Sequence, residues 1–197
     1  MVDQTARFLY VPDQIDNEIA GFKIEPNGTL TALSGSPFGR GPVPFGMLMD
    51  PRGKFVYEFA NILDTPTFLI ATYSISDEGN LAPIPSSPFD LTGGFPEDAA
   101  IDRNSLRLFV GNQSNSVSVY SIETQGLLQQ IPSSPFPITV SPIAVSVEPK
   151  GGFLYVGNFY GTSIFGYKTA NNGGLKPLPN SPFATGRYGG EIVIKSR

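Results

Sequence analysis

The chain has 197 residues, with 13 Lys and Arg against 17 Asp and Glu, and its formal net charge of −4 comes without a run of either sign. It contains no Cys and no His, which excludes disulfides, thiolate nucleophiles, zinc–thiolate centres and the usual general base of hydrolases. The basic patches of nucleic-acid-binding proteins are also missing, so we expect no nucleic acid as a partner.

The N-terminus carries no apolar segment of signal-peptide length, and no apolar run in the sequence is long enough to span a bilayer. We therefore expect no membrane association and a cytoplasmic location for the chain as given. An extracellular or periplasmic location would follow if the chain were a piece of an exported protein.

Short strands separated by turns are predicted along the whole chain, because 22 Gly and 19 Pro are spread evenly between apolar runs. The predicted strands are, in chain order, residues 7–11, 19–24 and 30–33; 46–49, 54–59, 68–75 and 81–84; 99–102, 106–111, 117–122 and 127–131; and 143–148, 153–157, 164–167 and 175–178.

Each of these four groups ends in the same motif, Ser-Pro-Phe, preceded at fixed offsets by a Gly and two aliphatic residues. The motifs begin at Ser36, Ser87, Ser134 and Ser181, so that successive copies are 51, 47 and 47 residues apart. A period of this length is typical of a blade of four strands in a β-propeller. The loop at residues 61–66 accommodates the longer first spacing.

The sequence therefore predicts an all-β fold, a propeller of four four-stranded blades forming a single domain, with repeat units of approximately 1–38, 39–89, 90–136 and 137–183. The first group lacks an innermost strand, and residues 190–195 are expected to supply it and close the ring. A four-bladed monomer, a homodimer that completes an eight-bladed ring and a piece of a larger ring all stay open.

Several segments resemble the lactonase-type β-propellers, the family of the propeller 6-phosphogluconolactonases and the YVTN-repeat proteins. These are Phe-Leu-Tyr-Val-Gly-Asn at residues 153–158, the related run at 108–112, the Asp-Pro-Arg-Gly turn at 50–53 and the Ser-Pro-Phe endings. The resemblance implies hydrolysis of a sugar lactone at a site built from His, Arg and Glu. Because this chain has no His, a carboxylate would have to act as the base. The alternative is a non-catalytic propeller scaffold that binds a protein or carbohydrate partner.

Charges that the other repeats lack occur in the loops leading into the innermost strands, which meet at one mouth of a propeller channel. They are Arg40, Glu97, Asp98, Arg187 and Glu191. We expect a small anionic sugar or lactone to bind there, with Glu97 and Arg187 catalytic and the other three residues binding substrate. In this hypothesis Glu97 deprotonates the attacking water, Arg187 polarises the carbonyl, and Asp98 raises the pKa of Glu97. The alternative is a set of salt bridges at the rim.

Glu58 stands where the other repeats have Val, so it is either a functional acid with a raised pKa or a sign that this edge is wet beside the 61–66 loop. The second reading is favoured. Asn61, Asn112 and Asn158 follow the second strands and could bind Ca²⁺, but Asn after a strand is more often a turn residue. No metal and no cofactor are therefore expected.

Overall fold

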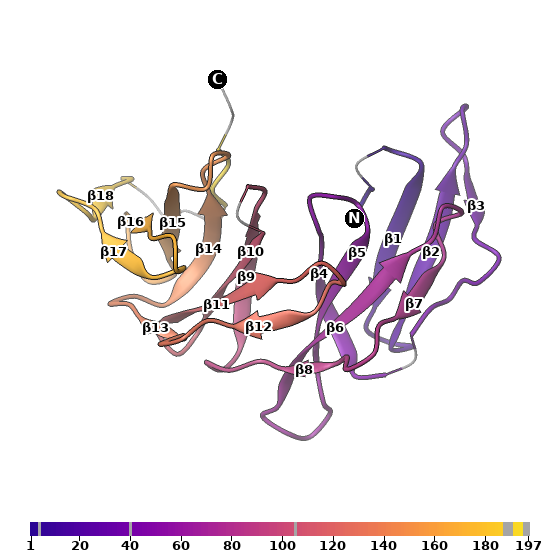
Figure 1. The fold of residues 1–197 in the computed structure, drawn as a ribbon, viewed down its shortest axis with the longest axis horizontal. Coiled ribbons are helices and arrows are strands. Elements are labelled where there is room, and N and C mark those ends of the chain that lie inside the picture. Colours follow the sequence, from indigo (N-terminus) through magenta and orange to yellow (C-terminus); the bar gives the residue numbers. More distant parts are fainter. Residues whose placement is uncertain (4, 40, 105, 187–190, 195–197) are drawn as a thin grey trace. The chain divides into compact units, whose positions relative to one another are not determined.

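A computed structural model describes residues 1–3, 5–39, 41–104, 106–186 and 191–194. Within these ranges the chain forms β-strands and turns and no helix, which confirms the predicted all-β class (Figure 1). The strands pair into four separate antiparallel sheets, one for each repeat of the sequence.

The four sheets follow one another along the chain. The first contains β1 (Phe8–Asp13), β2 (Glu18–Ile24) and β3 (Leu30–Ala32). The second contains β4 (Val43–Met49), β5 (Phe55–Asn61), β6 (Phe68–Ile75), β7 (Leu81–Pro83) and β8 (Phe89–Asp90). The third contains β9 (Pro96–Asp102), β10 (Arg107–Asn112), β11 (Ser116–Ile122), β12 (Leu128–Gln130) and β13 (Phe136–Pro137). The fourth contains β14 (Pro142–Val147), β15 (Phe153–Asn158), β16 (Ser163–Thr169), β17 (Leu175–Pro177) and β18 (Phe183–Ala184).

The Ser-Pro-Phe motif has the same structural role in every sheet. Its Ser hydroxyl accepts a hydrogen bond from a backbone N–H of the long strand, as in Ser134 Oγ with Val119 N at 2.8 Å. The Phe that follows pairs with the beginning of the same strand, and in three sheets it starts an additional two-residue strand. These sheets thus have five strands rather than the expected four, because the motif itself extends the ladder.

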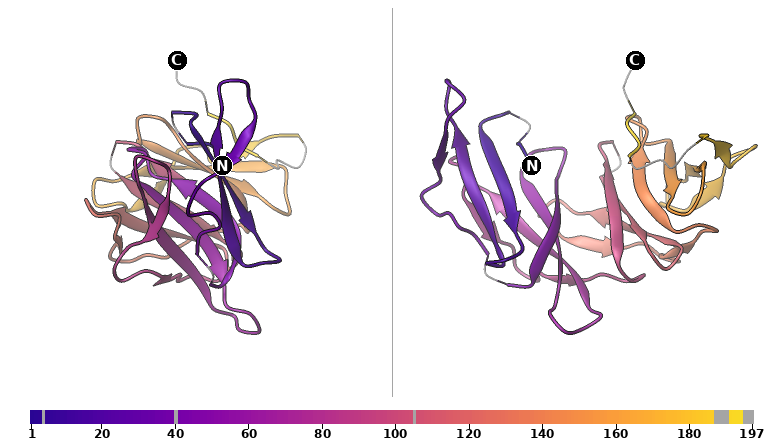
Figure 2. Two further views of the ribbon diagram at one scale, coloured as in Figure 1. Left: turned by 90° about the vertical axis from the view of Figure 1, so that its right-hand side faces the viewer. Right: turned by 180° about the vertical axis from the view of Figure 1, so that it is seen from behind.

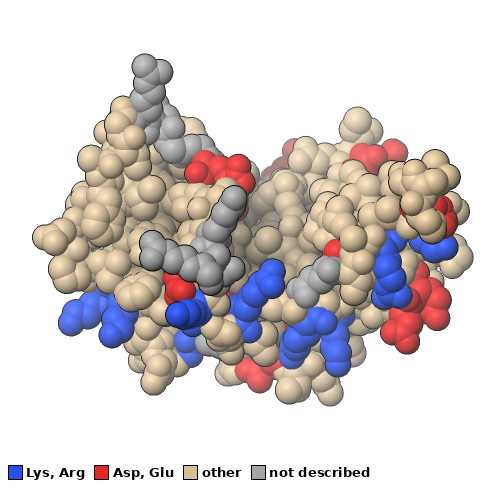
Figure 3. Space-filling model, turned by 90° about the horizontal axis from the view of Figure 1, so that it is seen from above, with Lys and Arg blue, Asp and Glu red and all other residues tan. Residues whose placement is uncertain are grey.

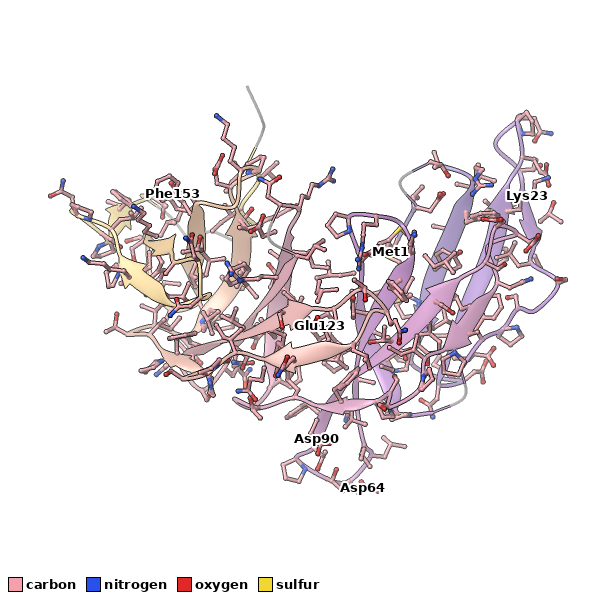
Figure 4. All side chains as sticks on the ribbon, viewed as in Figure 1. Met1, Lys23, Asp64, Asp90, Glu123 and Phe153 are labelled. Carbon is pink, nitrogen blue, oxygen red and sulfur yellow. The ribbon has the colours of Figure 1, made fainter. Side chains whose placement is uncertain are left out.

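An acidic residue forms the turn after the innermost strand in all four repeats. The sequence pattern identified Asp50, Asp102 and Glu148, and the structure adds Asp3, whose carboxylate accepts backbone hydrogen bonds from Arg7 and Phe8. Val2 forms a bridge with Leu9, and the Met1 ammonium donates to Tyr10 O at 2.7 Å, so the first residues lie along β1 (Figure 4). They occupy the place of the last residues of an innermost strand.

The chain divides into two compact units, residues 1–91 with 124–127 and residues 92–123 with 128–197, which we call the first and second units. Each unit contains two sheets and has its own core. Tyr10, Ile19 and Val56 are fully buried in the core of the first unit. Phe109, Val117 and Leu154 are fully buried in that of the second. Burial of one such side chain stabilises the fold by roughly 1.5–3 kcal/mol.

The long loop between β5 and β6 contains the insertion predicted from the sequence. It projects beyond its sheet, with Asp64 at its tip (Figures 2 and 4). Ile62 and Leu63 in this loop are exposed, so the added residues contribute little to the core. The insertion therefore leaves the pairing of β5 with β6 undisturbed from Asn61 and Phe68 onwards.

The expected closure of the first sheet by residues 190–195 is not confirmed. Residues 191–194, the described part of that segment, belong to no strand of the structure. In the described part of the chain, the first sheet has β1 at its edge, completed only by the bridge between Val2 and Leu9.

Candidate functional site

A β-bulge occurs at the same place in each of the three complete innermost strands. The pairing register shifts next to Phe45 in β4, Glu97 in β9 and Ile143 in β14. A bulge redirects a side chain and is often found beside a functional site. Glu97 is the charged residue among these three, and its Oε1 accepts a hydrogen bond of 2.6 Å from Nε2 of Gln113, in the turn between β10 and β11.

Asp98, the next residue of β9, links the two sheets of the second unit. Its Oδ2 accepts a hydrogen bond of 2.7 Å from the backbone N–H of Val145, in the innermost strand β14, and its Oδ1 accepts one of 2.8 Å from Ala99 N. The corresponding positions of β4 and β14 carry the small residues Gly46 and Ala144. The Asp98 carboxylate thus extends from the edge of one sheet to that of the next.

The pKa of Asp98 is raised above its ordinary value. Partial burial of the carboxyl group is the main cause, and the negative charge of Glu191 adds to it, whereas the N–H groups of Val145 and Ala99 act in the opposite direction. The residue as a whole is exposed, so its carboxyl group can exchange protons with solvent. A carboxyl group with these properties can take up and release protons at less acidic pH than an ordinary Asp.

Three of the five residues predicted for the site lie in the described part of the chain. Glu97 and Asp98 are neighbours on β9, and Glu191 lies within electrostatic range of Asp98. Arg40 and Arg187 lie outside the described residues. Sequence reasoning missed Gln113 and the Val145 N–H because neither bears a charge. Only the folded chain brings them next to β9.

A buried polar network holds the loop that leads into β9. The Asn112 amide donates hydrogen bonds of 3.0 Å to the hydroxyls of Ser116 and Ser118, and Ser118 in turn donates to Thr92 O at 2.5 Å. Gly93, with a φ of +105°, passes so close that a Cβ on it would lie 2.4 Å from Asn112 Nδ2. Asn112 therefore positions the segment that carries Glu97, instead of forming the surface turn that its place after a strand suggested.

An aromatic pair lies at the end of the fourth sheet where β14 begins. The rings of Phe159 and Tyr160, in the turn between β15 and β16, meet edge to face with centroids 4.8 Å apart. The Phe159 N–H donates to Ser141 O, directly before β14, and Tyr160 is 76% exposed. Ser141 is four residues from Val145, the partner of Asp98, so the aromatic pair and the acids occupy the same end of the unit.

Glu58 in the first unit departs from the sequence interpretation. We expected this acid on a wet edge, but the residue is only 4% exposed, and that interpretation is wrong. The carboxyl group accepts a hydrogen bond of 2.9 Å from the Tyr73 hydroxyl. Burial raises its pKa to about 7, although the hydrogen bond from Tyr73 opposes the rise. The inserted loop begins after Asn61 and leaves this part of β5 covered.

Asn158, which also follows a second strand, behaves as a turn residue. Asn158 Oδ1 accepts the N–H of Tyr160 at 3.2 Å. Among the residues that the structure describes, no group of three or more Asp and Glu side chains is placed to hold a metal ion.

Both signs of charge occur side by side on the face shown in Figure 3. Nowhere in the described ranges does a helix have the length and apolar character needed to cross a membrane.

Comparison with known proteins relates the chain to solved structures only. No family model and no curated protein matches it. A "putative 6-phosphogluconolactonase" from Bacteroides uniformis has a TM-score of 0.76 at 18% identity, over 94% of this chain and 54% of the other. The periplasmic gluconolactonase of Pseudomonas aeruginosa gives 0.74 at 17% identity, over 92% and 54%.

A protein of unknown function from Desulfotomaculum acetoxidans has a TM-score of 0.78 at 18% identity, with 99% of this chain covered and 58% of the other. At these identities the likeness concerns the fold alone. The chain spans a little over half the length of the solved structures that it matches.

Proposed function

We propose that the four sheets are blades of a lactonase-type propeller and that the second unit hydrolyses a sugar lactone, such as 6-phosphogluconolactone, at the beginning of β9 and β14. The observation that carries this proposal is Asp98, a carboxyl group of raised pKa held between two innermost strands. The fold shared with a gluconolactonase supports it.

The chemistry requires one activated water and one stabilised oxyanion. Water attacks the lactone carbonyl carbon while a carboxylate removes its proton, and the resulting tetrahedral oxyanion collapses as the ring C–O bond breaks. The same proton then passes to the departing ring oxygen, and the product is the open-chain hydroxy acid. We assign the proton transfer to Asp98, because a raised pKa suits it better to this task than an ordinary carboxylate.

Glu97 and Gln113 would orient the water, since their side chains are joined by a hydrogen bond of 2.6 Å at the bulge. We assign to Arg187, from the sequence alone, the role of stabilising the oxyanion. Tyr160 offers an exposed ring against which the C–H face of a sugar could pack.

The test is a pH-stat assay of δ-gluconolactone and its 6-phosphate, corrected for spontaneous hydrolysis. We expect Asp98→Asn to lower kcat at least 100-fold, because general acid–base catalysis contributes on the order of 10²- to 10⁴-fold. Glu123→Gln, at an exposed acid of the same unit, is the matched control and should keep full activity.

Turnover no faster than the spontaneous reaction in the unmodified protein would reject the catalytic proposal. If a sugar acid nevertheless bound to it in calorimetry, the non-catalytic scaffold would be the better description.

A further inference from the structure

A cavity of about 480 Å³ lies in the first unit, between the first and second sheets. It is bordered by the turn of Asp3, which precedes β1, and by the turn of Asp50, which joins β4 to β5. Three cationic side chains, Arg7, Arg52 and Lys54, line it. No residue of β9 or β14 takes part, so this cavity is separate from the proposed lactonase site.

The carboxylates of the two turns are already occupied by hydrogen-bond donors. Asp3 accepts the backbone N–H groups of Thr5, Arg7 and Phe8 at 2.6–3.1 Å, as well as the Thr5 hydroxyl. Asp50 is fully buried and accepts the N–H groups of Arg52 and Lys54. Asp50 also forms an ion pair with Arg52, so the charge of that guanidinium is balanced within the protein.

The two guanidinium groups are held in place within the protein. Arg7 donates to the Thr5 hydroxyl at 3.0 Å and to Asp77 O at 3.3 Å, and it lies 4.8 Å from the Phe8 ring centroid. Arg52 donates to Asp50 at 2.5 Å and lies 5.6 Å from the Phe55 ring centroid. Such groups need little reordering when an anion binds.

Lys54 is exposed, and its ammonium group makes no hydrogen bond or ion pair with any residue in the described ranges. This side chain can therefore move on its flexible stem to meet a ligand.

A corresponding cavity lies in the second unit and is lined by two cationic side chains, Arg107 and Lys150. It has a volume of about 280 Å³ and lies between the third and fourth sheets at the equivalent turns. Arg7 and Lys54 directly precede β1 and β5, and the residues that directly precede β10 and β15 are Leu106 and Gly152. Lys54 thus has no cationic counterpart in the second cavity.

We propose that the cavity of the first unit binds the phosphate group of a small hydroxylated molecule through Lys54, Arg52 and Arg7. Three donors converging from two turns suit the several oxygens and double charge of a phosphate better than the two oxygens of a carboxylate. The carboxylate of Asp77, which also lines the cavity, would accept a hydrogen bond from a ligand hydroxyl.

Isothermal titration calorimetry of the full chain with inorganic phosphate and with glucose 6-phosphate tests this proposal. Lys54→Gln should weaken the binding of both ligands about tenfold, since a charge-assisted hydrogen bond is lost. Lys168→Gln, at an exposed lysine of β16 in the second unit, is the matched control and should change either affinity less than about twofold.

Glucose 6-phosphate should bind more tightly than inorganic phosphate, and Asp77→Asn should reduce that difference. Absence of phosphate binding to the unmodified protein, or equal affinities in Lys54→Gln and Lys168→Gln, would overturn the proposal. Asp98→Asn should leave this binding intact, so failure of the lactonase proposal and failure of this one are distinguishable.

Discussion

The Tyr73 hydroxyl donates a hydrogen bond of 2.9 Å to the carboxyl group of Glu58 in the interior of the first unit. Tyr73 belongs to the apolar core around Tyr10, Ile19 and Val56, and Glu58 lies on the neighbouring strand β5 with 4% of its surface exposed. The core of the first unit thus contains an ionisable group with a single described side-chain partner. Its protonation is therefore coupled to folding.

The first prediction concerns stability and pH. Glu58 has a folded pKa of about 7 against an ordinary value of 4.5, so the folded state holds more protons than the unfolded state between these values. The free energy of unfolding should therefore fall as pH rises through this window, by on the order of 3 kcal/mol, and level off above it. Urea unfolding at pH 5, 6, 7 and 8 measures this slope.

Glu58→Gln should abolish this contribution, because Gln is neutral and can still accept the Tyr73 hydrogen bond. We expect the variant to be more stable than the unmodified protein at pH 8 and close to it at pH 5. The exposed acid Glu78 provides the control variant Glu78→Gln, which should keep the slope. A slope that persists in Glu58→Gln would assign the pH dependence to another group.

The second prediction concerns the repeated motif. Ser134→Ala removes the acceptor of the N–H of Val119, a fully buried residue of β11. The loss should lower the free energy of unfolding by about 1–3 kcal/mol. The exposed Thr124, in the turn before β12, gives the control Thr124→Ala, for which we expect less than about 0.5 kcal/mol. Equal effects in urea unfolding would show that the hydroxyl is not the stabilising group.

The third prediction concerns sugar binding by Tyr160. If its exposed ring packs against the substrate, Tyr160→Ala should raise KM for δ-gluconolactone about three- to tenfold and leave kcat nearly unchanged. Phe153→Ala, at the other end of the same hairpin, should leave KM as it is (Figure 4). A fall in kcat with constant KM would instead place Tyr160 in the chemical step.

The fourth prediction concerns self-association. Val11 is 41% exposed, whereas the corresponding Val110 and Val156 are fully buried. The reason is that β9 and β14 lie beside the strands of Val110 and Val156, whereas β1 forms the edge of its sheet in the described residues. Incomplete sheet edges tend to pair with other chains. We expect light scattering to give a mass near twice 21.1 kDa at high concentration. Val11→Lys should restore the monomer mass, and a monomer at all concentrations would contradict this prediction.

Much of the fold follows from the sequence because the repeat acts locally. Each Ser-Pro-Phe bonds a long strand of its own repeat, as Ser134 does with Val119, so the same residues build the same sheet in every copy. The acidic turns are equally local, since Asp50 accepts N–H groups from residues two and four positions later. Strand order and the inserted loop could therefore be predicted.

Contacts between sheets could not be predicted from the repeat. The pKa of Asp98 is raised because its carboxyl group is partly buried, and its hydrogen bond from Val145 N opposes the rise. Val145 is 47 residues away, and no pattern around β9 indicates that partner. Glu58 was expected to be wet because a charged residue favours water, but its position on β5 places it in the core with Tyr73. Sequence by itself determined the four sheets through short-range hydrogen bonds. Which charges are buried, and with which partners, was decided only by the packing of one sheet on another.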